Sequence, residues 1–68
     1  MKVPINTRKI GEYLIQLGMN HADLARATKL DESIISRVFS KKEVTPRVLK
    51  RIADVFKCFP KELLCQDN

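Results

Sequence analysis

The sequence predicts an all-α domain, a compact bundle of five short helices. Its 68 residues include only two glycines and three prolines, too few for the many turns of an all-β domain. Apolar residues recur at spacings of three and four along the chain, and no window alternates as a half-buried strand would. A chain of this length suits one small hydrophobic core, so we expect residues 1–68 to form a single domain.

Capping residues divide the chain into these helices. Asn6 caps the first helix, and Gly18 ends it because glycine readily takes the left-handed conformation found at helix ends. Asn20 caps the second helix, and Asp23 three residues later provides a weak form of the capping box. The residues expected to face inward on these two helices are Ile10, Tyr13, Leu14, Leu17, Leu24, Ala25 and Thr28.

The remaining helices have start signals of their own. Asp31 is a suitable cap for the third helix, Thr45 followed by Pro46 marks the start of the fourth, and Pro60 opens a last short turn. The inward residues are expected to be Ile35, Val38, Phe39, Leu49, Ile52, Ala53 and Phe56, and the last turn carries Leu63 and Leu64. Because the second and third helices are short and closely joined, we expect them to cross as a helix-turn-helix over about residues 20–40.

The positive charge is concentrated in one third of the chain. The formal net charge is +5. Residues 37–51 hold six basic side chains against Glu43 alone, so this segment carries the whole net charge and the remainder balances to zero. The six are Arg37, Lys41, Lys42, Arg47, Lys50 and Arg51. A local positive field of this kind suits a polyanion, although a solvated basic surface without a partner would look the same.

Several classes of protein are disfavoured. No apolar run approaches the roughly 18 residues of a membrane span, and residues 1–10 lack the apolar core of a signal peptide, so we expect a cytoplasmic protein. Cys58 and Cys65 with His21 match no zinc-binding spacing, and the thiols are expected to be reduced. There is no glycine-rich phosphate loop and no catalytic group at triad spacing from His21. We therefore expect no cofactor, metal, small-molecule ligand or enzymatic activity.

Residues 20–63 carry an ordered set of matching positions: Leu24-Ala25, Leu30, Ile34 to Arg37, Pro46, Ile52-Ala53, and Pro60 before Leu63. At this spacing the segment NHADLARATKLDESIISRVFSKKEVTPRVLKRIADVFKCFPKEL resembles the helix-turn-helix family of phage repressors and Cro proteins. The resemblance implies a five-helix domain, encoded by a bacterium or phage, that binds operator DNA as a dimer. It also implies that the third helix, residues 31–39, lies in the major groove.

The chain departs from this family at four positions. The family commonly has glycine where this chain has Lys29, Lys41 and Lys57. Such positions often require a positive φ, which costs a non-glycine residue about 1 kcal/mol, so we expect the three lysines to be mildly strained. His21 replaces the family's glutamine at the start of the second helix, which puts the usual amide contact to phosphate in doubt.

The resemblance and the helical period together give candidate base contacts. With Ile35 and Val38 inward, the outward residues of the third helix match the family's base-facing positions. They are Glu32, Ser33, Ser36 and Arg37, with Ile34 beside them. The Arg37 fork can donate to guanine O6 and N7, and Glu32 can accept from cytosine N4. The alternative for each is a solvated side chain.

Two further sets of residues are assigned by position. The candidate phosphate contacts are Asn20, His21, Ser40, Lys41, Lys42, Thr45 and Arg47, of which Asn20 and Thr45 are at least helix caps. The candidate dimer surface is formed by apolar residues outside the inward stripe, namely Val55, Cys58, Phe59 and Leu64. These four would otherwise pack as a C-terminal cap on the core.

The function predicted from these residues is sequence-specific binding of double-stranded DNA. The protein would be a transcriptional repressor or regulator that binds a two-fold symmetric operator as a homodimer. The alternative is a protein-interaction module, such as an antitoxin-like helix-turn-helix protein. We expect no separate partner-binding segment after Asn68, which favours the DNA-binding function over this alternative.

Overall fold

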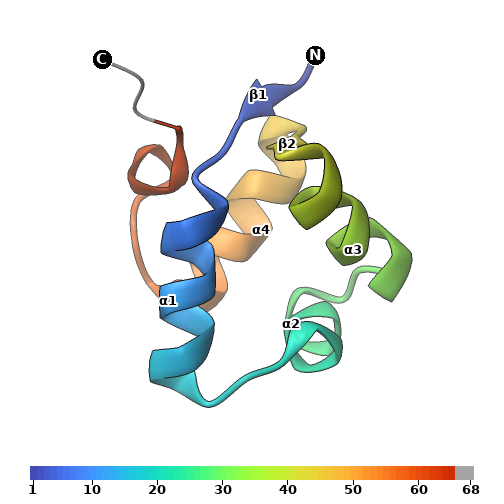
Figure 1. Cartoon of the computed structure of the whole chain (residues 1–68), viewed down its shortest axis with the longest axis vertical. Coiled ribbons are helices and arrows are strands. Elements are labelled where there is room, and N and C mark those ends of the chain that lie inside the picture. Colours follow the sequence, from blue (N-terminus) through green and yellow to red (C-terminus); the bar gives the residue numbers. More distant parts are fainter. Residues whose placement is uncertain (66–68) are drawn as a thin grey trace.

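The computed structural model of the protein describes residues 1–65. In this range the chain forms four α-helices, one 3-10 turn and a two-stranded antiparallel sheet (Figure 1). In chain order the elements are β1 (Val3–Pro4), α1 (Thr7–Leu17), α2 (His21–Thr28), α3 (Glu32–Lys41), β2 (Glu43–Val44), α4 (Pro46–Phe56) and η1 (Pro60–Leu63). The prediction of five helices in an all-α domain is therefore wrong in detail, because the fifth helix is a single 3-10 turn and a small sheet is present.

The helix starts were predicted correctly from the capping residues. The Asn6 side chain accepts a hydrogen bond from the Lys9 amide at 3.1 Å, and the Thr45 hydroxyl oxygen accepts one from the Val48 amide at 3.3 Å. Asn20 and Asp23 form the complete capping box, with N···O distances of 2.8 and 3.0 Å. Asp31 has the backbone conformation of a cap, but its carboxylate accepts no hydrogen bond from the first amides of α3.

The core draws on every part of the described chain. Its fully buried large side chains are Ile10, Leu24, Ile35, Ile52 and Leu63. Tyr13 and Phe39, which were predicted to face inward, are only half-buried. Leu17 was placed inward and is 50% exposed, because α1 ends there and the chain turns away at Gly18. The α4 helix runs through the middle of the bundle, with four buried side chains (Figure 1).

The small sheet joins the start of the chain to the connection between α3 and α4. Val3 pairs with Val44 and Pro4 with Glu43, and the Ile5 amide donates to the Lys42 carbonyl at 3.1 Å. On its other side, Ile5 bridges to Leu64. Ile5 and Val44 are thereby buried in the core. Two-residue strands are too short to show alternation, which explains why the sequence pattern did not predict them.

Three lysines adopt the left-handed conformation at helix ends. Lys29 and Lys57 have φ of 61° and 58°, as predicted from their alignment with family glycines. The third is Lys42, with φ of 58°, and the prediction for Lys41 was wrong. Lys41 is still helical because α3 extends one residue further, so the strained position moves to the next residue.

Glycine substitution can test that Lys42 is left-handed and Lys41 is helical. Lys42→Gly and Lys57→Gly are each expected to raise the free energy of unfolding by about 0.5–1 kcal/mol, because glycine tolerates positive φ. Lys41→Gly is the matched control and is expected to lower it by a similar amount, because glycine weakens a helix interior. Thermal unfolding of the three variants measures the effect. A stabilising Lys41→Gly would contradict the helix end observed here.

Candidate nucleic-acid interface

The helices α2 and α3 are joined by a tight turn at residues 29–31. The left-handed Lys29 directs its amide to the Arg26 carbonyl at 3.2 Å, and the Leu30 amide reaches the Ala25 carbonyl at 3.0 Å. The buried Thr28 hydroxyl donates to the Leu24 carbonyl at 2.8 Å, so this buried side chain has its hydrogen-bond partner. These contacts fix the direction in which α3 leaves the turn.

The predicted base contacts lie together on one exposed face of α3. With Ile35 and Val38 buried, the side chains of Glu32, Ser33, Ser36 and Arg37 are all exposed. Within residues 1–65 neither Glu32 nor Arg37 takes part in an ion pair, so both end groups are free to bind an outside partner. Ile34 is different, because it is half-buried and lines a cleft with Val44 and Val48 at the edge of this face.

The start of α2 borders this face on one side. The His21 ring stacks on the Phe39 ring with centroids 4.2 Å apart and an interplanar angle of 14°. The stack holds the first residue of α2 against the second half of α3. Asn20, next to it, uses its side-chain oxygen as the helix cap and is otherwise exposed. The periodicity of the sequence carries no signal for a contact between residues so far apart.

The start of α4 borders α3 on the other side. Thr45 lines the same cleft as Ile34 and Arg37, and Arg47 follows in the first turn of α4. Ser40, Lys41 and Lys42 at the end of α3 are exposed, and the Ser40 hydroxyl donates to the Arg37 carbonyl at 3.4 Å. The candidate phosphate contacts thus lie on two sides of α3, with its exposed face between them.

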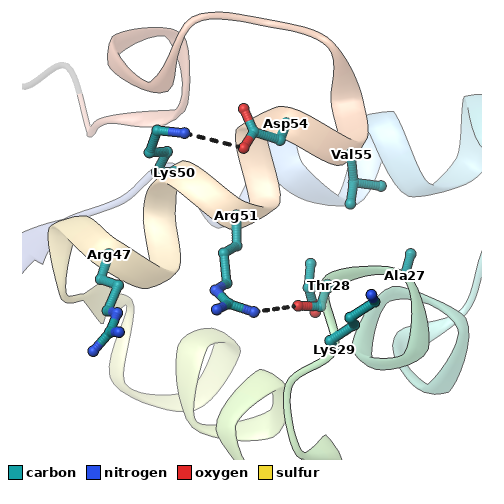
Figure 2. A pocket seen from close by; sticks show the side chains of 8 residues that line it. All are labelled: Ala27, Thr28, Lys29, Arg47, Lys50, Arg51, Asp54 and Val55. Atoms are coloured by element: carbon teal, nitrogen blue, oxygen red, sulfur yellow. Dashed lines mark hydrogen bonds and ion pairs between the residues drawn. The ribbon is translucent and has the colours of Figure 1, made fainter.

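A second cleft, of about 490 Å³, lies between the end of α2 and α4 (Figure 2). Lys29, Arg47, Lys50 and Arg51 line it, as does Asp54. The Lys50 ammonium pairs with Asp54 at 3.3 Å. Part of the charge of residues 37–51 is therefore already paired with an acid of the protein itself, in an exposed ion pair that the charge count of the sequence did not reveal.

Arg51 has a structural role that sequence reasoning missed. Figure 2 shows its guanidinium directed at the Thr28 carbonyl, with an Nη1···O distance of 3.1 Å. This hydrogen bond joins residues 23 positions apart in the sequence. It joins α4 to one of the last carbonyls of α2, where a cation also meets the negative end of the helix dipole.

The sequence matches the model of one protein family over most of its length. The family is described as the Cro/C1-type HTH DNA-binding domain, and its model matches residues 9–65. The chain belongs to this family. The resemblance seen in residues 20–63 is thereby confirmed, and the protein is a helix-turn-helix DNA-binding protein. No curated protein and no solved structure matches the chain.

The apolar residues assigned to dimerisation divide into two groups in this Cro/C1-type domain. Val55, Cys58 and Leu64 are half-buried and pack against the core, as the alternative of a C-terminal cap would have it. Phe59 is 71% exposed and remains free to meet a partner. A further exposed residue, Ile15 on α1, is 81% exposed and was not singled out from the sequence.

The two thiols of the domain have different surroundings. Burial raises the pKa of the Cys58 thiol, although a hydrogen bond with Tyr13 acts in the opposite sense. The same hydrogen bond raises the pKa of Tyr13, whose ring stacks on Phe56 with centroids 4.8 Å apart. Cys65 is exposed. In residues 1–65 no three His, Cys, Asp or Glu side chains gather to hold a metal ion, and no helix could span a membrane.

Alkylation is expected to distinguish the thiols. Iodoacetamide at pH 8 should modify Cys65 well before Cys58, because the thiolate is the reactive form and Cys58 is held as the thiol. Since its pKa is raised on folding, Cys58 stabilises the fold below the ordinary cysteine pKa and loses this contribution as the pH rises through its folded pKa. Mass spectrometry of the modified peptides over time measures the alkylation rates of Cys65 and Cys58. Equal alkylation rates of the two cysteines in the folded protein would contradict the expected protection of Cys58. Urea-unfolded protein is the control, because the protection of Cys58 depends on the fold.

Proposed function

We propose that the protein binds double-stranded DNA sequence-specifically and regulates transcription, as a homodimeric repressor on a two-fold symmetric operator. The observation that carries this proposal is the exposed face of α3, bordered by the starts of α2 and α4. The major groove is about 12 Å wide and admits an α-helix. With α3 in the groove, the start of α2 meets one phosphate backbone and the start of α4 meets the other.

Base recognition is assigned to the four exposed side chains of α3 and to Ile34. Arg37 offers the donor fork that pairs with guanine, and Glu32 offers an acceptor for cytosine N4. Ser33 and Ser36 can bond to bases or phosphates, while the half-buried Ile34 can meet a thymine methyl at the edge of the groove. Phosphate repels the carboxylate of Glu32, so this side chain cannot raise the affinity for DNA in general. Its proposed role is in the choice of base, and the neighbouring cations supply the affinity.

Affinity is assigned to the phosphate contacts on both sides of α3. On the α2 side these are Asn20 and His21, and on the other side Ser40, Lys41, Lys42, Thr45 and Arg47. Each neutralised phosphate releases counterions, so binding should weaken steeply as salt is raised. The positive dipole ends of α2 and α4 add a favourable interaction with phosphate.

Two observations support a dimer. The domain measures 31 × 23 × 19 Å, which allows two copies to stand side by side with their α3 helices about one helical turn, or 34 Å, apart. Phe59 presents a large apolar side chain to solvent beyond the end of α4. A Phe59→Ser variant should therefore be more monomeric than the wild type in sedimentation equilibrium, with the fold retained.

Selection of bound sites from random duplex DNA tests the proposed function. The expected result is one enriched sequence with two-fold symmetry and half-sites about one helical turn apart. Enrichment of a single, asymmetric half-site would contradict the symmetric dimer. No enrichment at all, under low-salt conditions in which the protein binds DNA, would contradict sequence-specific recognition.

The exposed Phe59 and Ile15 also favour a second candidate function, a module that binds another protein. In that case a partner would purify with the protein in a fixed ratio and Phe59→Ser or Ile15→Ser would release it. Neither substitution lies on the exposed face of α3, so DNA binding by these variants would separate the two functions.

A further inference from the structure

The two-stranded sheet places Lys2 beside the proposed DNA-binding surface. Val3 pairs with Val44 in the antiparallel register, so the next position outward sets Lys2 opposite Thr45. Thr45 is the cap of α4 and one of the candidate phosphate contacts. The Ile5 amide, bonded to the Lys42 carbonyl at 3.1 Å, fixes the register from the other end.

The side chains agree with this register. Lys2 lines the cleft between α3 and the start of α4 together with Ile34, Arg37 and Thr45. The apolar side of this cleft, which has a volume of about 210 Å³, is formed by Val38, Val44 and Val48. The residue just before β1 therefore stands next to three residues assigned to DNA contact, although it is far from them in the sequence.

The charge and exposure of Lys2 suit phosphate. Lys2 is exposed and belongs to none of the ion pairs within residues 1–65. Glu43 is the one acid among the residues that line the cleft, against Lys2 and Arg37, so the cleft is positive overall. A lysine ammonium is a compact point charge on a flexible stem, which matches a phosphate oxygen better than the planar edge of a base.

We propose that Lys2 contacts the phosphate backbone that the start of α4 approaches, and that the residue preceding β1 is therefore part of the DNA interface. This inference rests on the proposed function. It adds a contact that the basic segment 37–51 does not include. The sheet fixes the backbone of the adjacent Val3, so ordering Lys2 on binding costs less than ordering a free chain end.

A salt titration of Lys2 variants tests the inference. Binding of a mixed-sequence duplex about three helical turns long is measured by fluorescence anisotropy at several salt concentrations. For Lys2→Ala and Lys2→Gln, the slope of log K against log salt is expected to become shallower by about 0.9 per subunit. Lys2→Arg keeps the charge and should keep the wild-type slope.

Lys61→Ala is the matched control, because Lys61 is also exposed but lies on η1 and outside the cleft. It should leave the slope unchanged. If Lys2→Ala and Lys2→Gln also keep the wild-type slope, or if Lys61→Ala changes it as much as they do, the inference on Lys2 is overturned while DNA binding stands. A wild-type protein whose affinity does not respond to salt would instead overturn the proposed function.

Discussion

Replacing Arg37 by alanine is expected to relax sequence preference at one base pair of each half-site. The loss of a bidentate contact to guanine should cost about 1–3 kcal/mol on the preferred sequence and much less on sequences with another base there. Arg37 is suited to this role because it is exposed, forms no ion pair within residues 1–65 and lies on the outward face of α3. Dissociation constants for duplexes carrying each of the four bases at each position would measure the effect.

Lys42→Ala is the matched control for this prediction. Lys42 is the C-cap that follows α3 and is assigned to phosphate, so its removal should weaken all sequences by the same factor and make the salt dependence shallower. If Arg37→Ala gave that uniform pattern too, Arg37 would be a phosphate contact. Base recognition would then have to rest on Glu32 and the two serines.

Replacing Ile52 in the core by alanine is expected to cause a large loss in the free energy of unfolding. Ile52 is fully buried on α4, and truncating a buried isoleucine to alanine costs about 2–5 kcal/mol. A core of this size supplies a net stability of only about 3–5 kcal/mol, so the variant should be largely unfolded or close to it. Urea unfolding followed by circular dichroism measures the change.

Ile15→Ala makes the same chemical change at a site that is 81% exposed. It should alter the free energy of unfolding by no more than about 0.5 kcal/mol. A cost comparable to that of Ile52→Ala would mean that Ile15 is covered in solution, for example by a second copy of the chain. Repeating the measurement at several protein concentrations would reveal such a copy.

Local chemistry explains which parts of the fold were predictable. Asn6, Gly18, Asn20 and Thr45 act within one turn of their own positions, so a sequence pattern is sufficient to place the helix ends. The left-handed residue after α3 was misplaced because it was carried over by alignment. One extra helical residue moved it from position 41 to Lys42.

The exposed face of α3 was predictable because it also depends on a local sequence pattern. The exposed face of α3 follows from its buried side, which periodicity reveals. The contacts that position this face are long-range: His21 stacks on Phe39, and Arg51 bonds to Thr28. The place of Lys2 in the cleft at the start of α4 is also set by distant parts of the chain. Such contacts depend on how elements pack in three dimensions, and no spacing along one sequence encodes them.

The stacking of His21 on Phe39 also gives the molecule a built-in spectroscopic reporter. His21 is the single histidine of the chain, so its ring protons give resonances that need no assignment by mutagenesis. With the rings 4.2 Å apart and nearly parallel, the aromatic ring current of Phe39 should shift these resonances upfield. A one-dimensional proton spectrum recorded during a DNA titration would then report any change in the angle between α2 and α3.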